Sequence, residues 1–174
     1  MIQIIKLQLS VISFDYYFLL CLLLILTNCS IMGTSSNTSH AKNISYLVPA
    51  HWIETDSNGE SEKAFKLSSG ATVTLTSTCQ STRENTLETL TKDLLLGARK
   101  INYIKQEKIS IANSQALFSE VTAHLEGVYF YLQFIVAKKN SCIFDFSLVS
   151  AKPISAKESE DFFGFAKSFN YVKS

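Results

Sequence analysis

Apolar residues recur at alternate positions between Leu117 and Leu148, and this period of two restricts the segment to β-structure. Glu126 and Gly127 interrupt the pattern as a two-residue turn, after which the same parity resumes. A slip of one residue would turn every inward side chain to the other face, so the parity places Leu125 opposite Val128. The sequence therefore predicts an antiparallel meander.

A second break in the meander falls at Lys139, Asn140 and Ser141. A three-residue loop with Asn140 in the left-handed conformation keeps the parity if Val136 lies opposite Phe144. On the same inward face as Val136, this register would place Cys142, Phe144, Phe146 and Leu148.

Further strands and two helices are expected around the meander. β-branched residues alternate over residues 71–79, which indicates a half-buried strand, and another strand is expected around residues 103–111. A Leu-rich helix of about three turns should begin with Asn85 and Glu88 as its capping pair, and a Phe-rich terminal helix should begin at Ser155. Helices and strands segregate along the chain, which favours the α+β class.

An apolar run from Tyr16 to Leu26 ends shortly before Cys29. Its length fits the roughly 7–15 residues of a signal-peptide core better than the roughly 20 residues of a spanning helix. Leu26, Thr27, Asn28 and Cys29 resemble a bacterial lipobox, although Gly, Ala or Ser is commoner than Asn before the cysteine. We therefore expect cleavage before Cys29 and a diacylglycerol group on its thiol.

An uncleaved membrane anchor is the alternative interpretation. A run of spanning length would have to include Asp15, whose carboxylate costs about 3 kcal/mol inside hydrocarbon. The lipobox divides the chain into a signal peptide over residues 1–28, which includes Cys21, a flexible polar tether over residues 29–43 and one domain over residues 44–174.

The charge balance gives no sign of a nucleic-acid-binding surface, which would show as a clustered basic face. The chain has 16 Lys and Arg against 15 Asp and Glu, and these residues are interspersed. The expected partner is instead the membrane, which the protein would bind through the lipid on Cys29. The domain would then lie in the periplasm or at the surface of a bacterial envelope. Ser30 rather than Asp after Cys29 favours the outer over the inner membrane by the enterobacterial sorting rule.

The order of the expected elements resembles the PsbP-like fold, an α-β-α sandwich shared by an extrinsic photosystem II subunit and a nuclear-import factor. The residues that carry this resemblance are Val48, Pro49, Trp52, Phe162, Phe165, Ser168 and Phe169, with Cys79 and Cys142. More narrowly, the positions of Cys79 and Cys142 look like those in a group of uncharacterised bacterial lipoproteins with this fold, and the resemblance covers about residues 44–172. The resemblance implies a central antiparallel sheet with two main helices, and it carries over no functional residue.

Cys79 and Cys142 fall on predicted apolar faces of separate strands in a chain expected in an oxidising compartment. We expect a disulfide between them, which would add about 4 kcal/mol on the chain-entropy model. Two buried free thiols are the alternative. A redox pair is disfavoured, because the sequence has no Cys-x-x-Cys spacing.

The sequence contains few candidate catalytic residues. His40, His51 and His124 are expected to be exposed and share no metal-ligand spacing, so neither a metal nor another cofactor is predicted. Phosphate-loop and nucleophile-elbow motifs are absent. An acidic loop, interpreted as a solvated hairpin with cation or basic-partner binding as the alternative, comprises Glu54, Asp56, Glu60 and Glu62.

Tyr129 and Tyr131 fall on the other face of the meander, beside Ile135. This stripe is either a docking surface or a face covered by a helix. The sequence therefore predicts a non-enzymatic binding or assembly module with a candidate protein partner in the envelope. The alternatives are an envelope enzyme with a dispersed site near His51 and the acidic loop, and a structural subunit of an envelope complex.

Overall fold

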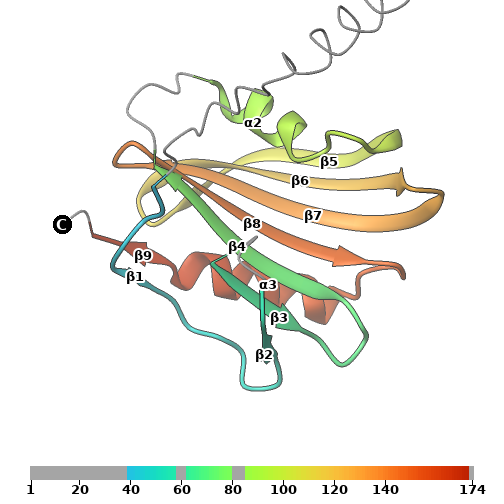
Figure 1. Ribbon diagram of the computed structural model, residues 1–174, viewed down its shortest axis with the longest axis horizontal. Coiled ribbons are helices and arrows are strands. Elements are labelled where there is room, and N and C mark those ends of the chain that lie inside the picture. Colours follow the sequence, from blue (N-terminus) through green and yellow to red (C-terminus); the bar gives the residue numbers. More distant parts are fainter. Residues whose placement is uncertain (1–38, 58–61, 80–84, 173–174) are drawn as a thin grey trace, which may run out of the picture. The chain divides into compact units, whose positions relative to one another are not determined.

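A seven-stranded sheet forms the centre of the protein, with strands in the order β2-β3-β4-β8-β7-β6-β5 and every neighbouring pair antiparallel. In this computed structural model, helix α2 lies on one face of the sheet and α3 on the other (Figure 1). The structure describes residues 39–57, 62–79 and 85–172. The predicted signal peptide, Cys29 and Glu60 lie outside the described residues.

The sheet strands are β2 (Ile53–Thr55), β3 (Lys63–Lys66), β4 (Thr72–Cys79), β5 (Arg99–Ile111), β6 (Ser114–Leu125), β7 (Val128–Lys139) and β8 (Cys142–Ser150). A separate antiparallel pair consists of β1 (Ile44–Ser45) and β9 (Asn170–Tyr171). The helices are α2 (Leu87–Asp93) and α3 (Ala156–Ser168). All of these elements belong to one compact unit, Thr38–Ser174, and its layers pack against one another. The expected α+β class is confirmed.

The register between β6 and β7 is the one that the sequence predicts. Leu125 pairs with Val128, and the pairing continues without a shift to Ala116. Glu126 and Gly127 both have positive φ, 50° and 85°, as a type I′ hairpin turn requires. Turn chemistry and apolar parity therefore agree in this hairpin.

The register between β7 and β8 differs from the prediction by one residue. Asn140 and Ser141 form a two-residue turn, with φ values of 52° and 65°, and Lys139 pairs directly with Cys142. The three-residue loop expected from the sequence is therefore wrong. Serine tolerates positive φ less readily than glycine, so the second turn position gave no clear sequence signal.

The shorter turn moves Phe144 to the opposite face of the sheet from Val136. Ala137, not Val136, pairs with Phe144. Ile135 and Ala137 are as buried as Val136, because helices cover both faces of the sheet here. When both faces are apolar, alternation no longer identifies which set of side chains faces which helix.

The α3 face of the sheet holds the larger core, rich in aromatic side chains. It includes Trp52, Phe65, Phe144, Phe146, Phe162, Phe165 and Phe169. The capping box predicted for α3 is present: Ser155 Oγ accepts from the Glu158 amide, and the Glu158 carboxylate accepts from the Ser155 amide at 2.8 Å. The cap fixes the start of α3, so that its Phe face meets the sheet.

Helix α2 is shorter than expected and begins one residue later. Thr86, rather than Asn85, is the N-cap, and its Oγ1 accepts from the Thr89 amide at 3.2 Å. The helix packs on β6 and β7 and ends at Asp93. Among the described residues, therefore, no helix covers the part of this face over β4 and β8 (Figure 1).

Candidate functional site

An apolar pocket of about 310 Å³ lies where the chain leaves α2 and crosses the sheet. This volume is at the lower end of the roughly 300–1,000 Å³ of ligand pockets. Its walls come from four strands and the α2–β5 connection, and the lining residues are Thr74, Thr76, Leu94, Leu95, Leu96, Ala98, Ala123, Leu125, Phe130, Leu132, Phe134, Asp145, Ser147 and Val149.

One wall of the pocket is the segment that follows α2. Backbone bonds from Leu95 to Lys92 and from Ala98 to Leu95, both 3.0 Å, extend the helix as tight turns. Leu95 is buried in a cluster with the sheet residues Val121, Leu132 and Phe134, and it holds the segment in place. Three consecutive leucines cannot share one helical face, so Leu94 and Leu96 remain exposed at the rim, 38% and 79% respectively.

The floor of the pocket changes from apolar to polar across the sheet. Over β6 and β7 it is formed by Ala123, Phe130 and Leu132, whereas over β4 and β8 it carries the hydroxyls of Thr74 and Ser147. These two oxygens lie 2.6 Å apart and form a hydrogen bond. The polar part comes from the Thr-bearing face of β4, which sequence parity predicted to be the outer face.

The side chains that line the pocket carry little charge. Asp145 is the one ionisable residue of the described lining, which includes neither Lys, Arg nor His. A histidine or cysteine that could act as base or nucleophile is likewise missing from this lining. The arrangement can therefore hold an apolar or amphiphilic molecule, but it does not assemble a nucleophile with a base.

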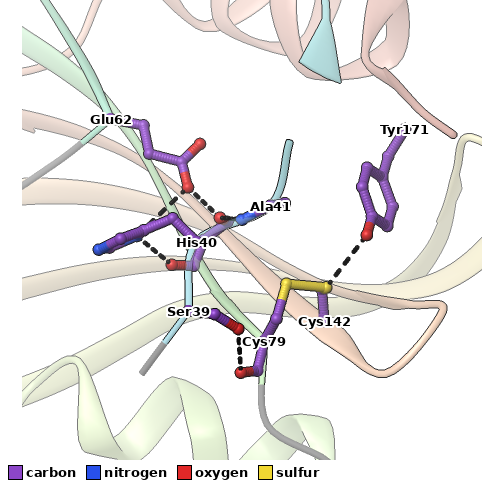
Figure 2. Close-up of a disulfide and its surroundings, with 8 residues drawn as sticks. Ser39, His40, Ala41, Glu62, Cys79, Cys142 and Tyr171 are labelled. Carbon is purple, nitrogen blue, oxygen red and sulfur yellow. Dashed lines mark hydrogen bonds and ion pairs between the residues drawn. A yellow bond between two sulfur atoms is a disulfide. The ribbon is translucent and has the colours of Figure 1, made fainter. Parts of the chain in front are cut away.

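At the other end of the strands, Cys79 and Cys142 form the disulfide expected from the sequence (Figure 2). The two residues are direct partners of β4 and β8, with Cα atoms 4.1 Å apart. The Tyr171 hydroxyl lies 3.5 Å from Sγ of Cys142. The bridge thus joins two neighbouring strands of the sheet, and the Tyr171 hydroxyl brings β9 into contact with it.

The end of the predicted tether is attached to this same region. Ser39 exchanges two hydrogen bonds with the backbone of Cys79, at 2.8 and 3.1 Å. The Ala41 amide donates to Ser77 Oγ at 2.7 Å (Figure 2). The segment expected to stay flexible up to residue 43 is therefore docked on β4 from Ser39 onward.

The three histidines lie apart from the pocket. His40 Nδ1 is 2.9 Å from the Ser77 carbonyl oxygen and 3.5 Å from the Glu62 carboxylate. His51 Nε2 is 3.3 Å from Asp161 Oδ2. His40 and His51 are exposed as expected, whereas the half-buried His124 packs edge-on against a tyrosine ring.

Two residues of the predicted acidic loop, Glu54 and Glu62, have different partners in the described part of the chain. Glu54 pairs with Lys63, and this hydrogen bond raises the pKa of the lysine. Glu62 accepts from the Ser77 hydroxyl on the sheet. His51 does have a carboxylate within reach, but that carboxylate is Asp161 of α3 and not a residue of the loop.

The tyrosine stripe is partly covered. Ile135 is fully buried in the core on the α3 face, whereas Tyr129 is 41% exposed and its ring packs edge-on against Tyr131 at 5.1 Å. The interpretation as a helix-covered face therefore applies to Ile135, whereas docking at Tyr129 and Tyr131 stays a prediction.

Among the described residues, no set of three or more His, Cys, Asp and Glu side chains is arranged to hold a metal ion. Within the same residues, neither helix has the length and apolar character needed to cross a membrane.

Known proteins resemble this chain in structure and not in detectable sequence. No family model and no curated protein matches the sequence. A structure from Bacteroides thetaiotaomicron has 18% identity and a TM-score of 0.53 over 75% of this chain, which spans only 45% of that protein. LpqN, involved in cell envelope biogenesis of Mycobacterium tuberculosis, has 7% identity and a TM-score of 0.59, covering 80% of this chain and 88% of LpqN.

Cyanobacterial PsbP from Synechocystis has 16% identity and a TM-score of 0.54, covering 83% of this chain and 97% of that protein. At such identities the likeness shows the fold and not the activity. The resemblance inferred from the order of elements is confirmed at that level. The described domain therefore has the PsbP-like fold, with a central antiparallel sheet between two helices.

Proposed function

We propose that this protein is a lipid-anchored, non-enzymatic binding protein of a bacterial envelope that holds an apolar ligand in the α2 pocket. The observation that carries the proposal is the pocket itself. It is preformed, lined mainly by Leu, Phe and Ala, and lacks a histidine or cysteine in its described lining. Ligand sites of binding proteins combine such an apolar lining with a few polar groups.

Three observations support the envelope. The lipobox-like sequence before Cys29 supplies an anchor. The disulfide between Cys79 and Cys142 is typical of an oxidising compartment. LpqN, which shares the fold, is described as involved in cell envelope biogenesis. On the basis of Ser30, we favour localisation at the outer membrane over the inner membrane.

The pocket begins close to the tether and extends away from it along the sheet. The tether joins β4 at Cys79 through Ser39, and the nearer side of the pocket is at Thr76 on the same strand. The farther side reaches Leu125, the last residue of β6 before the β6–β7 turn. A domain held at Ser39 therefore presents the Leu125 rim of the pocket on the side away from its attachment point.

The enzyme alternative rests on the pair of His51 and Asp161. Asp161 also binds Lys157 at 2.8 Å, one turn earlier on α3. The pair of His51 and Asp161 lines neither the α2 pocket nor a second pocket near Thr86. A surface ion-pair network explains it as well as catalysis does, so we favour binding.

Native mass spectrometry of the protein released gently from its own membranes tests this function. We expect an excess mass from a bound small molecule, which Ala98→Phe abolishes by filling the pocket. Ala151→Phe is the matched control, because Ala151 is exposed and outside the pocket lining. A wild-type protein that never carries such a mass, or a ligand retained equally by both variants, would contradict the proposal.

A further inference from the structure

We propose that the ligand of the α2 pocket is a molecule with a single acyl chain and an uncharged, hydroxyl-bearing head group. This inference rests on the proposed function and specifies its ligand. It draws on three properties of the pocket: its volume, the direction in which its lining changes from apolar to polar, and its charge.

The volume and the walls fit one chain. At about 310 Å³, the pocket is at the small end of the range for ligand sites, too small for a lipid with several chains to enter fully. The apolar lining continues outward to Leu96 and Leu125, which are 79% and 46% exposed. Such a rim extends the contact with an elongated apolar ligand that is longer than the cavity.

The polar end fits a hydroxyl-bearing head group. The hydroxyls of Thr74, Thr76 and Ser147 line this end, and each can both donate and accept a hydrogen bond. The Thr74–Ser147 bond of 2.6 Å shows that these groups are close enough to serve one small polar group together. A ligand with hydroxyls can form these bonds in either direction.

The charge of the pocket disfavours an anionic head group. Asp145 lies beside Ser147 and Thr76, and the described lining offers no cationic side chain to pair with an anion. An anion placed there would lose hydration, and no cationic side chain of the described lining would offset that loss, which opposes binding. A fatty acid, ionised at neutral pH, should therefore bind more weakly than its glycerol ester.

Calorimetric titration with 1-monoacylglycerols of eight, ten and twelve carbons tests the proposal. The protein used is the chain from residue 29 with Cys29→Ser, which retains the compact unit Thr38–Ser174 and carries no acyl group of its own. We expect the affinity to rise about fourfold per methylene, as burial of about 0.8 kcal/mol per CH₂ implies. Laurate should bind at least tenfold more weakly than monolauroylglycerol at neutral pH.

Two variants connect the binding to the pocket. Ala98→Phe should weaken monolauroylglycerol binding at least tenfold. Leu96→Ala, at a rim position too exposed to affect folding, should weaken it severalfold, whereas Leu47→Ala, an equally exposed leucine on the chain between β1 and β2, should leave it unchanged.

The outcomes separate this inference from the proposed function. Equal affinity for laurate and its glycerol ester would overturn the uncharged head group. Affinity independent of chain length would overturn the acyl chain. In both cases a membrane-derived ligand lost from Ala98→Phe would leave the proposed function standing. A native ligand that is not a single-chain amphiphile would likewise overturn the inference alone.

Discussion

Breaking the disulfide should cost this domain a large part of its stability. Cys79 and Cys142 are separated by 63 residues, and closing a loop of that length in the unfolded chain contributes about 4 kcal/mol at 25 °C on the chain-entropy model. For a unit of about 140 residues, with an unfolding entropy of about 2.1 cal/mol/K per residue, this corresponds to a loss of roughly 14 °C in Tm. Native stabilities of about 5–15 kcal/mol leave little margin for such a loss.

Urea denaturation of three samples measures the effect. These are the oxidised protein, the reduced protein and the variant in which Cys79 and Cys142 are both alanine. Because the chain-entropy model assigns the stabilisation to the unfolded chain, most of the loss in free energy of unfolding should appear on reduction alone. The double variant should unfold close to the reduced protein. As a matched control, reductant should leave the double variant unchanged.

The free energy of unfolding decides the result. A loss below about 1 kcal/mol on reduction would refute the chain-entropy reasoning for this bridge. Alkylation of both thiols in the untreated protein would show that no bridge exists. Full stability after reduction but not in the double variant would assign the effect to side-chain packing around Tyr171 and not to the cross-link.

Three further predictions concern α3 and the anchor. Burial alone would raise the pKa of Glu158, but hydrogen bonds from Ser155 outweigh burial and lower the pKa. The ionised carboxylate therefore stabilises the fold above its unfolded pKa, and this stabilisation is lost as the pH falls through the folded pKa. The free energy of unfolding, measured from pH 7 to pH 3, should accordingly depend less on pH in Glu158→Gln than in the wild type. Phe165→Ala should lower the free energy of unfolding by about 3–5 kcal/mol in urea titrations, because Phe165 is 1% exposed and packs among other rings. Phe163→Ala, at a half-buried position of the same helix, should cost clearly less. Equal losses in the two variants would contradict the packing described. The intact mass of the membrane-bound protein should show cleavage before Cys29 plus acyl chains, and a full-length mass would instead indicate an uncleaved anchor.

The sequence predicted the elements of the fold better than the way they face one another. In the β6–β7 hairpin, Gly127 is a turn former and the apolar parity is the same on both sides of Glu126 and Gly127, so the predicted register was right. At Asn140 and Ser141, two apolar faces made either register plausible, and the choice of Val136 opposite Phe144 was wrong. The two-residue turn sets the pairing, and both faces of β7 are buried, which sequence alternation does not report.

The pocket could not be predicted from the sequence, because it depends on how far α2 reaches across the sheet. The prediction of about three turns would have extended the helix to Gly97, whereas it ends at Asp93. One signal was available. Three consecutive leucines at Leu94, Leu95 and Leu96 cannot all face the sheet from one helix.

Intermolecular NOEs between an isotope-labelled protein and monolauroylglycerol test most directly whether the α2 pocket is a ligand site. We expect contacts from the acyl methylenes to the side chains of Leu95, Leu132 and Phe130, and from the glycerol protons to Thr74. Contacts confined to the exposed face around Tyr129, or none at saturating ligand, would contradict binding of this class of ligand in the pocket.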